Sequence, residues 1–390
     1  MIKNIYSFIK NKRALSTGFL FAVSSLIFGI WVASIPAVKY RFHFTDATLG
    51  LSLLLAPLGA ISGMLISRFI FSKVAVGWWM FHGYILVCII MILQVNAVNK
   101  QMLWVCLYFY GLVSFLNGVS ANATVNLLEE KFSQYIMSTC HAMYSLGGAV
   151  SAGVAAFLFS VNISSGWQIE IVALFIIIIM LLCRKLLLAN TEIIHTKSDF
   201  KFPSKSILGL SFICMVSFMA EGSVADWSAI FFREELHTKR NLASLGYLGF
   251  SAAMTIGRLN GDSIRSKFGR KKIVIFGSIL SAVGFLLVSL SGSVPEAVAG
   301  FVLVGLGCSC IVPVLFSASA KIPGVSTVDG FAMITTGGLI GFLAGPSVIG
   351  FLSSRFDLPR AMLLLTVLAI ASAYVAWSNK YLPRRRSARK

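Results

Sequence analysis

Apolar runs of about 20 residues recur along the whole chain, and this feature constrains the fold more than any other. A run of that length crosses the ~30 Å hydrocarbon core of a bilayer as an α-helix. Of 390 residues, 57% are hydrophobic and 12% are charged, whereas a soluble domain has about 25% charged residues. Because one hydrophobic core stops growing near ~250–300 residues, a water-soluble fold could not bury this apolar surface. The sequence therefore predicts an integral membrane protein.

Twelve such runs are separated by polar segments, and each should be a complete helix because lipid offers no partner to free backbone groups. The predicted helices cover residues 15–38, 47–70, 74–96, 102–127, 135–160, 167–188, 206–232, 242–264, 272–292, 295–318, 329–353 and 358–380. We therefore expect an all-α integral membrane fold of twelve transmembrane helices in two six-helix bundles. Residues 1–188 should form the N-terminal bundle, 189–205 a cytoplasmic linker, and 206–390 the C-terminal bundle with a basic cytoplasmic tail.

The net charge of +19 would suggest a nucleic-acid partner in a soluble protein. Here the basic residues lie in short segments between the apolar runs, without a basic stripe interleaved with aromatics, so we expect no nucleic acid. With the N-terminus in the cytoplasm, 24 of the 33 Lys and Arg residues fall in inner segments and 8 in outer loops. This positive-inside bias predicts that both termini are cytoplasmic. We expect a multi-pass protein of a bacterial inner membrane.

The sequence offers no sign of a cofactor or an enzyme. All seven cysteines lie inside apolar runs, and none has the spacing of a zinc site. Outside the predicted spans there is no Ser/His/Asp arrangement, phosphate loop or metal-spaced cluster. We therefore expect no cofactor, no metal and no enzymatic activity.

An internal repeat supports the division into halves. With a shift of 196 residues, Trp31 aligns with Trp227, and the segment 47–50 (Ala-Thr-Leu-Gly) aligns with 243–246 (Ala-Ser-Leu-Gly). Two helix pairs that share one shift favour six-helix halves in parallel repeat, which is a known plan of transporters.

Glu221 is the exception among the acidic residues, which otherwise lie in loops or near helix ends. It lies ~21 Å from the cytoplasmic start of its predicted helix, where an ionised carboxylate costs at least ~2.5 kcal/mol. We interpret Glu221 as a group that binds a proton or substrate hydroxyls in a central cavity; the alternative is a neutral acid hydrogen-bonded between helices. Asp226 is either a gate or a partner of a neighbouring helix. Trp31 and Trp227 are candidate cavity aromatics.

Arg258 and Asp262 are four residues apart near the cytoplasmic end of the eighth predicted helix, so they can pair on one helix face. A charge pair at a helix end can hold two bundles together in one state and release them in another. We interpret the pair as a cytoplasmic gate, with static anchoring as the alternative.

The fourth and fifth predicted helices carry polar side chains. Asn122 lies on the fourth, while His141 and Tyr144 form a polar face with Ser145 on the fifth. Polar side chains in a span face either other helices or a wet cavity. Asn122, His141 and Tyr144 are therefore candidate proton or substrate contacts, and a purely structural role stays open for each.

The chain resembles the major facilitator superfamily, and more narrowly its YbjJ-like branch, which is distantly related to the fucose permeases. The segments that carry the resemblance are 31–39 (Trp-Val-Ala-Ser-Ile-Pro-Ala-Val-Lys), 221–229 (Glu-Gly-Ser-Val-Ala-Asp-Trp-Ser-Ala), Gly257-Arg258 with Gly261-Asp262, 312–318 and Gly345-Pro346. It departs from the family at residues 67–73, where the usual acidic gate signature is absent, and at Gly118, where relatives carry an aspartate. The resemblance implies alternating access by two six-helix bundles, often coupled to protons.

These observations predict a monomeric secondary transporter in the lipid bilayer that carries a small polar solute, such as a sugar, together with a proton. A proton-driven exporter of amphiphilic compounds is the main alternative, although its usual glycine-proline signature is absent from 145–153. A membrane receptor that has kept the carrier fold and lost transport is a further alternative.

Overall fold

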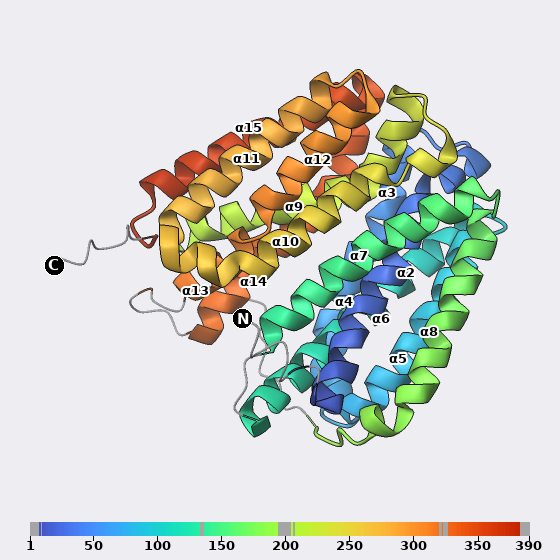
Figure 1. Ribbon diagram of the computed structural model, residues 1–390, viewed down its shortest axis with the longest axis vertical. Coiled ribbons are helices and arrows are strands. Elements are labelled where there is room, and N and C mark those ends of the chain that lie inside the picture. Colours follow the sequence, from blue (N-terminus) through green and yellow to red (C-terminus); the bar gives the residue numbers. More distant parts are fainter. Residues whose placement is uncertain are drawn as a thin grey trace. The chain divides into compact units, whose positions relative to one another are not determined.

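The computed structural model describes residues 8, 10–132, 136–193, 204, 205, 207–319, 322 and 327–382 (Figure 1). Within its helices, the side chains of residues 138, 262, 263, 266, 327–329 and 331 are not described. The linker from 194 to 203 and the basic tail from 383, both predicted to be cytoplasmic, lie outside these residues.

The described part of the chain is built from helices and contains no strand. The elements are α2 (Lys12–Phe42), α3 (Asp46–Leu53), α4 (Leu55–Phe71), α5 (Val76–Val95), α6 (Lys100–Phe132), α7 (Met137–Ser160), α8 (Ser165–Leu188), α9 (Leu208–Ile230), the π-helix η1 (Phe231–Glu235), the 3₁₀ turn η2 (Arg240–Leu242), α10 (Leu245–Phe268), α11 (Arg270–Leu290), α12 (Val294–Cys308), α13 (Ile311–Ser319), α14 (Thr327–Arg355) and α15 (Leu358–Ser378).

Eleven helices in this part are long and apolar enough to cross a membrane, judged by length and composition. Each of the twelve predicted runs coincides with a helix, and the run that lies outside these eleven is α10. That helix contains Arg258, Asn260 and Asp262 within three turns, which lowers its apolar content. The prediction of an all-helical membrane fold with about twelve apolar helices is confirmed.

Two predicted helices are interrupted, and a proline accounts for each break. The run 47–70 divides into α3 and α4 at Leu54, and the run 295–318 divides into α12 and α13. Pro57 and Pro313 each follow a break by three residues or fewer. Proline has no backbone N–H, so the carbonyl four residues earlier loses its helical partner. The ladder resumes at the next residue, since Leu58 N donates to Leu54 O at 3.1 Å and Val314 N to Cys310 O at 3.3 Å.

The chain folds as two compact units. Unit 1 takes its described residues from Met1–Phe44, Leu51–Lys197 and Lys239–Leu248, and unit 2 takes them from Thr45–Gly50, Ser198–Thr238 and Gly249–Lys390. Residues 45–50, from the first half of the chain, therefore belong to unit 2, and residues 239–248, from the second half, belong to unit 1. The six-and-six division with a cytoplasmic linker at 189–205 stays a prediction.

Glycines bring helices close together within each unit. In unit 1, a methyl group at Gly111 of α6 would overlap the Ala56 carbonyl oxygen of α4, and one at Gly59 would overlap the Tyr108 carbonyl oxygen. In unit 2, a methyl group at Gly341 of α14 would overlap the Met215 carbonyl oxygen of α9. Small residues allow such close packing in membranes, where lipid tails are as apolar as the side chains.

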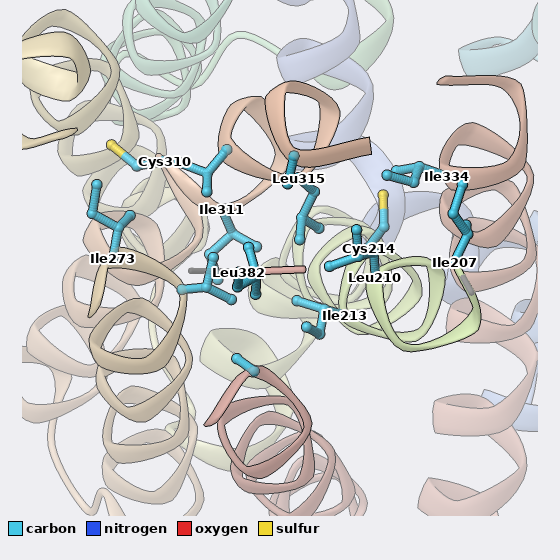
Figure 2. Close-up of a cluster of buried hydrophobic side chains, with 14 of the residues drawn as sticks. Ile207, Leu210, Ile213, Cys214, Ile273, Cys310, Ile311, Leu315, Ile334 and Leu382 are labelled. Carbon is cyan, nitrogen blue, oxygen red and sulfur yellow. The ribbon is translucent and has the colours of Figure 1, made fainter. Parts of the chain in front are cut away.

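Unit 2 also contains a cluster of buried apolar side chains that joins α9, α11, α13 and α14 (Figure 2). Leu210 and Ile213 come from α9, Ile311 and Leu315 from α13, and Ile273 from α11. All five are at most 7% exposed. The cluster fixes α11 and α13 relative to α9. Helix α9 carries Glu221, the acidic residue that the sequence places most deeply in a span.

Candidate functional site

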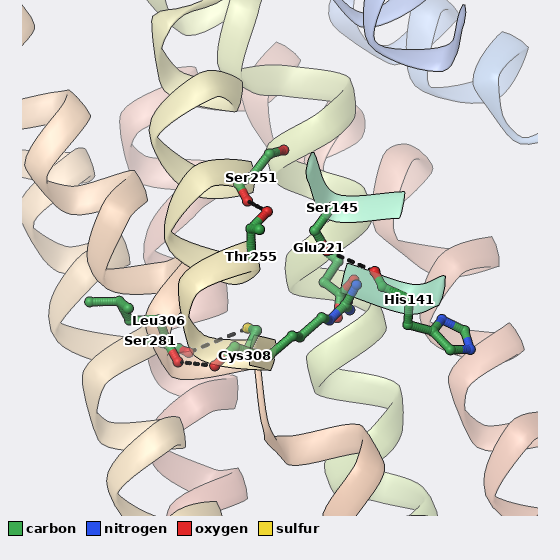
Figure 3. Close-up of polar contacts among 10 residues, drawn as sticks. His141, Ser145, Glu221, Ser251, Thr255, Ser281, Leu306 and Cys308 are labelled. Atoms are coloured by element: carbon green, nitrogen blue, oxygen red, sulfur yellow. Dashed lines mark hydrogen bonds and ion pairs between the residues drawn. The ribbon is translucent and has the colours of Figure 1, made fainter. Parts of the chain in front are cut away.

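Glu221 of α9 and Arg258 of α10 meet inside unit 2. An Nη2 atom of Arg258 lies 3.5 Å from Oε2 of Glu221, and the two side chains are 18% and 19% exposed, respectively. Figure 3 shows the Glu221 carboxylate approached by a guanidinium group from α10. An ion pair that has lost most of its water interacts more strongly than a surface pair, because the surrounding dielectric is lower. Each charge therefore lowers the cost of burying the other.

Small polar groups from α11 and α12 surround this pair. Cys308 ends α12, and Figure 3 draws it together with Glu221. The hydroxyl of Ser281 on α11 lies 3.4 Å from the Cys308 sulfur, as Figure 3 shows. The Ser217 hydroxyl is buried one turn before Glu221 on α9. Helices α9, α10, α11 and α12 thus each carry a polar side chain in the part of unit 2 that Figure 3 draws.

Asp226 lies five residues beyond Glu221, about 140° around α9. Its side chain is partly buried, and the described residues give its carboxylate neither a hydrogen bond nor an ion pair. The two predicted acidic site residues therefore occupy different faces of α9. One has a cationic partner and the other has none.

The predicted pair of Arg258 with Asp262 cannot be followed in the structure, because the Asp262 side chain is not among those described. The Asp262 backbone lies in α10, one turn beyond Arg258. What the structure does place beside Arg258 is Glu221, a partner that the helical spacing did not indicate.

The two predicted cavity aromatics are deeply buried. Trp227 is 0% exposed and Trp31 is 2% exposed. The Trp227 ring packs on Gly350 of α14, and no described residue accepts a hydrogen bond from its indole nitrogen. In this structure Trp227 therefore contributes mainly to the packing of α9 on α14.

In unit 1, the predicted polar residues lie on α6 and α7. Asn122 donates from Nδ2 to the Gly118 carbonyl oxygen of its own helix at 2.8 Å. The His141 ring meets the Phe21 ring edge to face at a centroid distance of 5.3 Å. Tyr144 is 37% exposed. These three predicted residues belong to the same unit, and Asn122 does not contact the other two in any described hydrogen bond.

Sequence reasoning missed an aromatic group in unit 1. The rings of Phe28 on α2 and Tyr110 on α6 are parallel, with centroids 6.3 Å apart, and Tyr247 meets Phe28 edge to face at 6.4 Å. Tyr84 of α5 lies within hydrogen-bonding reach of the Ser24 side chain. These residues come from four helices and lie inside apolar runs, so no local spacing relates them.

Gly118 opens onto free space. A methyl group built at this position meets no atom within 4 Å, although Gly118 lies near the middle of α6 and is only partly exposed.

Among the described residues, no group of three or more His, Cys, Asp or Glu is arranged to hold a metal ion.

Comparisons with known proteins agree with this architecture. The family model of the Major Facilitator Superfamily matches residues 208–390. An uncharacterized MFS-type transporter of Yersinia pestis is 33% identical over 371 residues, which cover 93% of this chain and 95% of that protein. The crystal structure of a mutant of the nucleoside transporter NupG matches with a TM-score of 0.75 and 12% identity, covering 95% of this chain and 100% of NupG. A bacterial homologue of the human lysosomal transporter Spinster, inward-facing and occupied, matches with a TM-score of 0.72 and 15% identity, covering 95% and 96%.

Proposed function

This chain belongs to the major facilitator superfamily, and we propose that it carries a small polar solute across the membrane by alternating access coupled to proton movement. The observation that carries the proposal is the Glu221–Arg258 ion pair, held 3.5 Å apart with about four-fifths of each side chain buried. The family membership supports a secondary transporter, and the proposal adds a class of solute and the proton as coupling ion.

The ion pair can couple protonation of Glu221 to binding of the solute. Burial of two charges costs free energy that their mutual attraction offsets only while both are present. A proton on Glu221 removes that attraction, so the Arg258 guanidinium is no longer held to the Glu221 carboxylate. Arg258 can then donate to an oxygen of the solute. Solute binding and protonation therefore favour the same rearrangement, which is the requirement for coupling.

The groups near the pair favour a hydroxyl-rich solute. The Ser217 hydroxyl is buried one turn before Glu221, and the guanidinium of Arg258 has five N–H donors. Such donors and acceptors match the oxygens of a sugar or a related metabolite better than a lipophilic cation. NupG, which shares this fold, is a nucleoside transporter, and nucleosides are polar solutes that contain rings. The likeness to the fucose permeases in the signature segments of the sequence points the same way.

The other predicted site residues complete the proposal. Asp226, with no described partner, is a second position for a proton. Asn122, His141 and Tyr144 are proposed solute contacts, and Trp31 and Trp227 are proposed to shape the site by packing. Arg258 with Asp262 is proposed to act at the cytoplasmic end of α10. We place the protein in a bacterial inner membrane as a monomer with both termini in the cytoplasm.

The first experiment is a thermal-shift screen of the detergent-purified protein against sugars, nucleosides, organic acids and lipophilic cations at two pH values. A ligand at ~100 times its Kd stabilises the folded state by ~2.7 kcal/mol. We expect a hit among the polar solutes. A hit confined to the lipophilic cations would replace this proposal with the exporter of amphiphilic compounds.

The hit is then tested in proteoliposomes. We expect a pH gradient to drive accumulation in the wild type. We expect Glu221→Gln to abolish the accumulation while exchange of labelled for unlabelled solute continues. Glu130→Gln, at the exposed end of α6, removes one carboxylate elsewhere and serves as the matched control. Normal pH-driven accumulation in Glu221→Gln would exclude Glu221 as the coupling residue.

A further inference from the structure

Two arginines of unit 2 converge on one hydroxyl group. Arg265 in the last turn of α10 and Arg270 at the first position of α11 both donate to Oγ of Ser317 on α13. The distances from the two Nη2 atoms to that oxygen are 2.7 Å and 3.0 Å. Two guanidinium groups are thus held close together around a single neutral acceptor.

Neither guanidinium has an acidic partner among the described residues. Each arginine carries five N–H donors, and one donor on each is used by Ser317. Two nearby cations repel each other, and an anion bound between them would offset that repulsion. Lys271, next to Arg270, donates to the Asn379 carbonyl oxygen at 3.4 Å, so it adds positive charge to the same region without neutralising it. The arrangement therefore has donors and charge for an anion that the described side chains do not provide.

The fold holds these groups in place. Gly269 separates α10 from α11 with φ 77° and ψ 162°, and α11 begins there without a side-chain cap. The apolar cluster of Figure 2 contains Ile273 of α11 with Ile311 and Leu315 of α13. Ile273 is three residues from Arg270, and Leu315 is two residues from Ser317. Because α11 and α13 belong to this cluster and Ile264 of α10 packs against it, the helices that carry the two guanidinium groups are held in place before a ligand binds.

We propose that Arg265, Arg270 and Ser317 form a binding site for a phosphate group, presented by an anionic lipid headgroup or as free phosphate. Planar guanidinium groups bind phosphate oxygens through two parallel N–H donors each. The uncapped N-terminus of α11, a helix of 21 residues, adds free backbone N–H groups on the same side. The Ser317 hydroxyl, which now accepts from both arginines, turns to donate to the anion. This site is independent of the transport proposal, since Glu221 takes no part in it.

The source of the phosphate is tested with the full-length protein in two arms. In detergent, the melting temperature is measured with and without inorganic phosphate at constant ionic strength, with chloride as the balancing salt. In the second arm, native mass spectrometry measures retention of phosphatidylglycerol against phosphatidylcholine. We expect phosphate to raise the melting temperature by about 2 °C or more in the first arm, or selective retention of phosphatidylglycerol in the second. The arm that responds identifies the source.

Variants assign the effect to the site. Arg265→Gln and Arg270→Gln should each weaken the response about tenfold or more in ligand concentration, because each removes charge-assisted hydrogen bonds. Lys272→Gln removes the same charge from an exposed residue in the first turn of α11, and we expect it to keep the response. Arg270→Lys keeps the charge without the planar donor pair and should give an intermediate response in a protein that folds normally.

Two results would overturn the proposal. One is the absence of any response in both arms for the wild type. The other is an equal loss in Lys272→Gln and the arginine variants, which would reduce the effect to non-specific charge.

Discussion

Arg258 lies 3.5 Å from Glu221, although 37 positions separate them in the sequence and they belong to different helices of unit 2. Both side chains are about four-fifths buried. A charge removed from such a pair leaves the other charge in a poorly solvated position. The relationship therefore makes a prediction about stability that is separate from transport.

Glu221→Gln and Arg258→Gln should each lower the free energy of unfolding by about 2–4 kcal/mol, because each removes one charge of a mostly buried ion pair. The double variant should be less destabilised than the sum of the two single variants, by about 1–3 kcal/mol. Thermal unfolding of the four proteins in one detergent measures this cycle. Strict additivity would show that the two side chains do not interact in solution.

Asp226→Asn should have the opposite effect on stability. The Asp226 carboxylate has no described hydrogen bond or ion pair, so its neutralisation breaks no contact and removes the cost of placing a charge in a membrane helix. We expect the free energy of unfolding to stay unchanged or to rise by up to ~1 kcal/mol, while proton-driven uptake falls. The two measurements together are the test, and a loss of stability comparable to that of Glu221→Gln would reveal a partner for Asp226.

The helices of this protein could be predicted from the sequence because hydropathy and span length are local properties. The runs placed all twelve predicted helices, and the prolines at 57 and 313 explain where two of them are interrupted. The bilayer requires each apolar run to satisfy its own backbone groups. This requirement is why the fold could be predicted without any knowledge of tertiary contacts.

The pairing of the charged residues could not be predicted in the same way. Helical spacing indicates Asp262 as a partner for Arg258, and that pair stays a prediction. The contact of Arg258 with Glu221 joins α10 to α9, and no spacing within one helix indicates it. Which helix faces meet depends on the rotation of each helix and on close packing at glycines such as Gly341. The parallel rings of Phe28 and Tyr110 escaped prediction for the same reason, since they come from α2 and α6.

Two glycines of α6 should respond in opposite ways to alanine. A methyl group at Gly111 would overlap the Ala56 carbonyl oxygen, whereas one at Gly118 meets nothing within 4 Å. Gly111→Ala should therefore lower the free energy of unfolding by about 1–3 kcal/mol. Gly118→Ala should raise it by about 0.5–1 kcal/mol, because alanine is the better helix former. Thermal unfolding of both variants checks the pair, and a destabilised Gly118→Ala would mean that the space beside α6 is filled.

Gly269 connects the two arginines of the proposed phosphate site, and its backbone conformation makes a last prediction. At φ 77° and ψ 162°, a side chain is strained whatever space surrounds it. Gly269→Ala should lower the free energy of unfolding by about 1–2 kcal/mol and should also weaken the phosphate response, because Arg270 follows directly. Gly292→Ala is the matched control, since a methyl group there meets no atom within 4 Å and Gly292 is not among the residues with positive φ. Thermal unfolding with and without phosphate separates the two effects. A Gly269→Ala variant that is destabilised yet keeps the full phosphate response would show that the positions of Arg265 and Arg270 do not depend on this turn.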